Sequence, residues 1–129
     1  MDLSELHAMA ADQDKGRWFD LLDPVNGAAT GIRVRVAGPD SATQQRAQLA
    51  LVDELAEMAG PDGQVSAEHR ERARINCLAA CVLDWEISED GAPLPFTHRN
   101  VVRLLTAGRW VQSQIDGFAN DRAAFRGEQ

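Results

Sequence analysis

Two cysteines on a predicted helix are the first candidates for metal or redox chemistry. Cys77 and Cys81 are four residues apart, and His69 lies on the same i+4 row, so the three side chains would share one helix face. A zinc site usually needs four ligands, and the other histidines, His7 and His98, are remote in sequence. We therefore expect two free thiols in the core, where free cysteine is common, and neither a metal ion nor a cofactor.

Charged clusters are the second place where chemistry could occur. A catalytic pair of carboxylates would need one member kept protonated by an apolar setting, and nothing in the sequence supplies that setting around Trp85. The arginines of residues 70–74 alternate with acids, which is typical of a solvated helix face rather than an anion site. We expect a solvated loop for the four carboxylates near Trp85, which are Asp84, Glu86, Glu89 and Asp90.

Motifs for common enzyme classes do not occur in the chain. The sequence contains no phosphate loop, dinucleotide fingerprint, nucleophile elbow or zinc-protease motif. Its three histidines and several serines leave a catalytic triad open by composition, but no spacing singles one out. We therefore expect a protein that is not an enzyme and has no catalytic residues.

Aromatic residues and neighbouring arginines offer a different function, which is protein binding. Trp and Arg are enriched at the energetic centres of interfaces, and Trp18 and Trp110 each follow an arginine directly. Packing in the core is the alternative for most of the aromatic set. The candidate partner-binding residues are Trp18, Trp85, Phe96, Arg109, Trp110, Phe118 and Phe125.

Composition limits where such a protein can act. The 129 residues suit one domain, and a net charge of −7 lacks the basic footprint of a general nucleic-acid binder. The N-terminus has an acid where a signal peptide needs basic residues, and the longest apolar run, Cys77–Leu83, is too short for a membrane span. We expect a cytoplasmic protein that binds neither nucleic acid nor membrane.

Hydrophobic periodicity predicts an α+β fold that is mainly helical, with a small N-terminal β-hairpin packed on four or five helices. In the hairpin, Val34 and Val36 alternate with Arg33 and Arg35, as in a half-buried strand that a helix must cover. The predicted elements of the single domain are a helix at 1–15, the hairpin at 17–36, and helices at 40–59, 66–85, 97–107 and 109–126. Ser66 and Thr97 are the predicted N-caps of the helices that begin there.

Two helical stripes and one loop carry the more detailed expectations. The predicted buried face of helix 40–59 is an apolar stripe of Leu49, Val52, Leu55, Ala56 and Ala59, which Leu51 and Met58 widen. The stripe of helix 66–85 is formed by Ile75, Leu78, Val82 and Trp85. Between residues 86 and 95, Asp90-Gly91 predicts a turn across which Ile87 and Leu94 could pair as a short hairpin.

The order of these segments resembles the tail assembly chaperones of long-tailed bacteriophages and prophages. The resemblance covers roughly residues 17–126. It is sharpest at the segment Val82–Trp85, at the loop Gly91–Asn100 with its Pro-Phe-Thr, and at a C-terminal helix that closes on Phe125.

The resemblance implies a non-enzymatic role in virion assembly. Such a chaperone would bind the tape measure protein and keep it soluble until tube subunits assemble around it. Some members are made in a second, frameshifted form that recruits the tail tube protein, which adds that protein as a second partner. The family offers no binding motif that transfers to individual residues of this chain.

Two other functions stay open from the sequence, as does assembly into a homo-oligomer. One is another structural or completion protein of the phage head–tail module, and the other is a small acidic regulatory domain. Residues 1–65 hold 11 acids and 5 bases, net −6, whereas residues 66–129 hold 9 acids and 8 bases, net −1. Because most aromatic residues lie in the second half, we expect the partner surface there and a solubilising surface in the first half.

Overall fold

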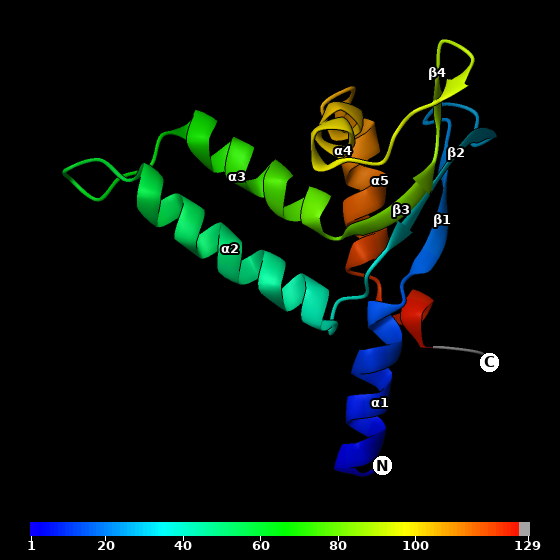
Figure 1. Ribbon diagram of the computed structural model, residues 1–129, viewed down its shortest axis with the longest axis horizontal. Helices are drawn as coiled ribbons and strands as arrows, with labels where there is room; N and C mark the ends of the chain where they lie inside the picture. Colours follow the sequence, from blue (N-terminus) through cyan, green and yellow to red (C-terminus); the bar gives the residue numbers. More distant parts are fainter. Residues whose placement is uncertain (127–129) are drawn as a thin grey trace.

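The computed structural model describes residues 1–126 and has an α+β fold that is mainly helical, as predicted. Figure 1 shows a three-stranded sheet on one side, a helical hairpin of α2 and α3 projecting to the other side, and α1 pointing away from both. In chain order the elements are α1 (Leu3–Asp14), β1 (Arg17–Leu22), β2 (Ala29–Val36), α2 (Ala42–Met58), α3 (Ala67–Ala80), β3 (Val82–Glu86), β4 (Ser88–Glu89), β5 (Ala92–Pro93), α4 (His98–Leu105), α5 (Arg109–Ala119) and a 3-10 turn, η1 (Arg122–Phe125).

The sheet is antiparallel, with β2 between β1 and β3. Val34 lies opposite Phe19 on one side and Trp85 on the other, and Val34 and Val36 are fully buried. Helix α5 packs against β1 and β2 and covers the apolar face of the sheet. The predicted hairpin therefore gains both the helix and the third strand that a two-stranded ribbon needs for stability in water.

The third strand corrects the prediction of a helix over 66–85. Helix α3 ends at Ala80, where the N–H of Cys81 bonds back to the carbonyls of Leu78 and Ala79. The residues that follow form β3, and Val82 and Trp85 are buried there just as a helix would bury them. A short apolar run fits the helical and the strand periodicity equally well. The strand forms here because the edge of β2, which is remote in sequence, is available to pair with it.

The C-terminal helix is also shorter than predicted. Helix α5 ends at Ala119, not near residue 126, and η1 follows as a separate turn. The Asn120 side chain donates to the Asp116 carbonyl at 2.9 Å, and the Asp121 carboxylate accepts from the Ala123 N–H at 3.1 Å. These local side-chain bonds offer the backbone an alternative to the helical ladder, which ends the helix.

Several local predictions are confirmed. Ser66 and Thr97 cap α3 and α4 by accepting the N–H three residues on, and Ser41 does the same for α2. The loop after β3 forms the short hairpin of β4 and β5, in which the N–H of Leu94 donates to the carbonyl of Ile87 at 3.0 Å. Each of these features depends on residues close together in the chain.

Helix α2 is rotated differently from the expectation. Its buried residues are Gln44 and Ala47, whereas Leu49 and Val52 are 60% and 63% exposed. The Gln44 amide donates to the carbonyls of Ala37, at 2.8 Å, and of Ala119, at 2.7 Å, which fixes the rotation of the first turns. Leu49, Val52 and Ala56 of the predicted stripe therefore point outward, whereas Leu51 and Leu55 are half-buried.

Helix α1 is attached to the rest of the molecule by its last turn. Gln13 is buried, and its side-chain oxygen accepts the N–H of Asp40 at 2.6 Å. Asp14 accepts the N–H groups of Ala42 and Thr43, at 3.1 and 2.9 Å, and so helps to cap α2. The first turns of α1 extend outward from this anchor (Figure 1).

Candidate functional site

Two of the seven candidate partner-binding residues belong to the aromatic core. Phe118 stacks on Phe19 with ring centroids 4.8 Å apart and contacts Phe125 at 5.1 Å. Phe125 is buried, and Phe118 is half-buried against the main core. Phe118 and Phe125 therefore hold α5 and η1 to the sheet.

Trp85 and Phe96 form a second aromatic group. Trp85 is buried, its indole N–H donates to the carbonyl of Leu94 at 2.9 Å, and Phe96 meets its ring edge-on at 5.6 Å. Phe96 itself is 41% exposed. The pair fixes the loop before α4, and only Phe96 offers surface to another molecule.

Trp18 lies on the outer, charged face of the sheet. The Arg33 guanidinium sits 4.9 Å from the centre of its ring, as in a cation–π contact. Arg33 also pairs with Asp20 at 2.9 Å and with Glu86 at 3.4 Å, on the two neighbouring strands. The charges of this face are therefore matched within the sheet, and Trp18 is partly covered by its own neighbour.

Arg109 and Trp110 begin α5, away from the other aromatic residues. Trp110 is 37% exposed and makes no ring contact with another aromatic residue in residues 1–126. Hydrogen bonds from Arg74 hold the pKa of Glu71 below its usual range, and the nearby charge of Arg109 adds to this effect. The structure thus does not bring the seven candidates together into one surface.

The two cysteines are buried free thiols, as the sequence predicted. The Cys81 sulfur donates to the carbonyl of Cys77 at 3.3 Å, and burial raises the pKa of Cys81 to about 12. Over residues 1–126, no group of three or more His, Cys, Asp or Glu side chains is placed to hold a metal ion. At neutral pH such thiols stay protonated and are poor nucleophiles.

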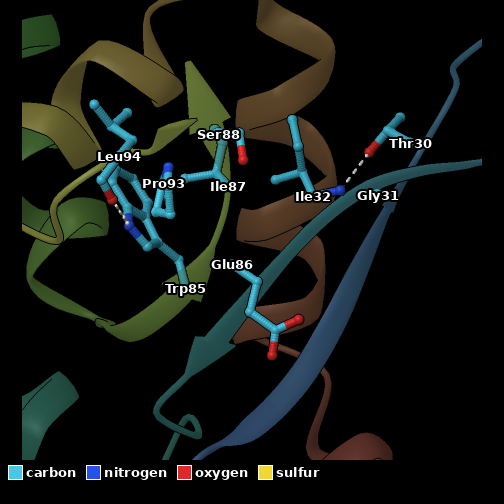
Figure 2. A pocket seen from close by; sticks show the side chains of 9 residues that line it. All are labelled: Thr30, Gly31, Ile32, Trp85, Glu86, Ile87, Ser88, Pro93 and Leu94. Atoms are coloured by element: carbon cyan, nitrogen blue, oxygen red, sulfur yellow. Dashed lines mark hydrogen bonds between the residues drawn. The ribbon is translucent and has the colours of Figure 1, made fainter. Parts of the chain in front are cut away.

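A groove opens where β2 and β3 part, and Figure 2 shows its lining side chains. The pairing of β2 with β3 reaches Arg33 and Glu86, and beyond it Thr30–Ile32 face the short β4–β5 hairpin across a space of about 700 Å³. Trp85, Ile32 and Leu94 supply apolar lining, and Glu86 is the one ionisable side chain among the nine lining residues. Such a groove can accept an apolar side chain or an extended segment, but it offers no acid–base pair.

A second concavity, of about 600 Å³, lies between α3, α4 and α5. Ile75 and Val102 supply its apolar surface, and the carboxylates of Glu68 and Glu71 stand at its rim. Sequence periodicity did not indicate either concavity, because both form between elements that are distant in the chain.

Comparison with known proteins identifies the family. A family profile described as YdaY prophage protein matches residues 40–129, which is 90 of the 129 residues. The chain belongs to this prophage protein family. No curated protein and no solved structure shows significant similarity to the chain.

The family assignment confirms the expected prophage character. It does not extend to the tail assembly chaperones that the segment order resembles. The matched part of this family member runs from α2 to the C-terminus, whereas α1, β1 and β2 lie before it. Among the described helices, none is long and apolar enough to cross a bilayer.

Exposed apolar side chains of this family member gather where the sequence did not predict them. Of its large hydrophobic residues, eleven are exposed in the described chain, and nine of these precede residue 66. Leu3 and Leu6 lie on α1 and Leu49 and Val52 on α2, whereas only Phe96 and Trp110 come from the second half. The expected partner surface in the C-terminal half stays a prediction, and among the described residues Phe96 and Trp110 are the large hydrophobic side chains that this half exposes.

Proposed function

We propose that this protein is a tail assembly chaperone of its prophage, which binds the tape measure protein and keeps it soluble in the host cytoplasm. The role is non-enzymatic, and the tail tube protein is a second partner during assembly. Membership of a prophage family and the segment order of the chain both support this proposal.

One observation carries the proposal most directly, which is the exposure of apolar residues on two helices that project from the body (Figure 1). Leu3 and Leu6 on α1, and Leu49 and Val52 on α2, are each more than half exposed. Exposed apolar faces bordered by polar residues mark protein-interaction sites, and helix faces are well suited to helical ligands. A tape measure protein is expected to be a long helical ligand of this kind.

The charge of the chain is consistent with a solubilising role. Residues 1–65 carry a net charge of −6, so the surface that would hold the apolar ligand also repels other copies of itself. Many weak contacts along one long ligand would then give a stable, soluble coat through avidity.

Co-expression tests the proposal. A fragment of the tape measure protein from the same prophage is produced alone, with this protein, or with an unrelated acidic protein of similar size, and its soluble fraction is measured. We expect this protein, and not the control, to keep the fragment soluble and to co-purify with it. Aggregation of the fragment beside well-folded protein would refute the proposal, and recovery of the protein from purified particles would favour a structural component of the virion.

A further inference from the structure

Helix α2 has two apolar faces, and the molecule itself uses one of them. Ala47 and Leu51 pack on the core side, next to α3, and Leu55 is half-buried. On the other side, Leu49 and Val52 are 60% and 63% exposed. With Gln45 and Ala56 they form an i, i+4, i+7, i+11 row, which we call the outer stripe of α2 (Gln45, Leu49, Val52 and Ala56).

The geometry of the outer stripe selects a helical ligand. A row at this spacing is the seam through which one helix packs against another. From Gln45 to Ala56 the outer stripe is about 17 Å long, and Figure 1 shows α2 at the outside of the projecting α2–α3 hairpin. An extended strand would find no unpaired backbone there, since the helix satisfies its own hydrogen bonds.

Charge beside the outer stripe selects the kind of helix. Asp53 and Glu57 are exposed along one edge of the stripe, and neither side chain forms an ion pair or a hydrogen bond with another residue in the described part of the chain. Arg46 shares the row of Asp53 and Glu57 at the i, i+7, i+11 spacing, so this edge carries a net charge of −1, and the third acid of α2, Glu54, accepts from the Asn76 amide of α3 instead. A second copy of the chain would therefore bring acid to acid at a net charge of −7 each, whereas a basic edge would be attracted.

From these observations we propose that the outer stripe of α2 binds an amphipathic helix whose apolar face is bordered by Lys or Arg. This inference rests on the proposed function, because it names the chemistry of the segment that the chaperone would hold. The stripe lies within residues 40–129, the part of the chain that defines the family match.

Synthetic peptides test the inference without the tape measure protein. One peptide of about 21 residues has Leu at the a and d positions of each heptad and Lys at e and g, and a second has Glu at e and g. Binding of each to the full chain is measured by titration calorimetry at low and high salt. We expect the Lys peptide to bind in a salt-sensitive manner and the Glu peptide to bind at least about tenfold more weakly.

Variants of the chain locate the binding site. Leu49→Ser with Val52→Ser should weaken the Lys peptide about tenfold or more, whereas Val25→Ser, at a residue 93% exposed in the β1–β2 turn, should not. Asp53→Lys with Glu57→Lys should shift the preference toward the Glu peptide. The matched control is Glu68→Lys with Glu89→Lys, two exposed acids outside α2.

The outcomes separate this inference from the proposed function. Equal binding of both peptides, or binding that the α2 variants leave unchanged, overturns the inference. The inference is also overturned if the free chain is a dimer and the double variant Leu49→Ser with Val52→Ser is a monomer. A second copy of the chain would then cover the stripe. If the Lys peptide binds through α2 but the tape measure fragment still aggregates, the inference stands and the proposed function fails.

Discussion

Replacement of Gln44 by Ala tests how the structure fixes the rotation of α2. Gln44 is 8% exposed, and its side-chain amide donates two hydrogen bonds that join three segments of the chain. One bond reaches the carbonyl of Ala37, just after β2, at 2.8 Å, and the other reaches the carbonyl of Ala119, at the end of α5, at 2.7 Å. The variant removes both donors and leaves the two acceptors in a buried setting.

The size of the effect follows from those two bonds. Each lost hydrogen bond, with a buried carbonyl left unsatisfied, costs about 1–2 kcal/mol, so we expect a total loss of about 2–4 kcal/mol of unfolding free energy. That is a large part of the about 5–15 kcal/mol by which native domains are usually stable. With a denaturant slope of about 1–3 kcal/mol/M, the urea midpoint should fall by about 1–2 M.

Urea unfolding followed by tryptophan fluorescence measures this change, since the chain has three Trp residues. Gln45→Ala is the matched control, because Gln45 is the next residue of the same helix and is exposed. The control should stay within about 0.5 kcal/mol of the parent chain. A loss below about 1 kcal/mol for Gln44→Ala, or an equal loss for Gln45→Ala, would refute the argument that the Gln44 amide anchors α2.

Two further predictions concern the backbone and the acid response. Gly16 has φ of +77° and a Cβ there would lie 2.8 Å from the Val36 carbonyl oxygen, so Gly16→Ala should cost more than about 2 kcal/mol. Gly27→Ala, at φ of +74° in open space, should cost about 1 kcal/mol by the same urea assay, and equal losses would exclude the steric reason. Burial opposes ionisation of Asp14, but hydrogen bonds from the N–H and hydroxyl of Thr43 outweigh it and hold the pKa of Asp14 below its usual value. Its contribution to stability is therefore full above the unfolded value of about 3.9 and is lost as the pH falls through the lowered pKa. Asp14→Asn should therefore weaken the loss of unfolding free energy on acidification, measured by urea unfolding between about pH 2 and 6. The same pH dependence in the variant and the parent chain would contradict the assignment.

Features that depend on neighbours in the chain were predictable from the sequence. Ser66 and Thr97 were expected as helix caps, and both accept the N–H that a cap should accept. The turn at Asp90-Gly91 was expected, and both residues have positive φ. In each case the interacting groups lie within a few residues, so the local sequence fixes the geometry whatever the rest of the fold does.

The candidate binding residues could not be separated from the core in the same way. Phe118 and Phe125 are residue types that also suit a partner surface, yet Phe118 stacks on Phe19 and Phe125 packs against Phe118 at a tilted angle. Aromatic residues serve interiors and interfaces equally well, and only the position of β1 against α5 decides between the two. Of the aromatic candidates, Trp18, Phe96 and Trp110 are exposed in the structure.

By itself, the sequence determined the mainly helical α+β class, the positions of caps and turns, and the location of most of the negative charge before residue 66. The tertiary structure decided that Val82–Glu86 is a strand, because the edge of β2 was available to pair with it. It also decided which face of α2 meets solvent, since Gln44 bonds to a carbonyl 75 residues away. Both decisions rest on contacts between distant segments, which periodicity in a single segment cannot report.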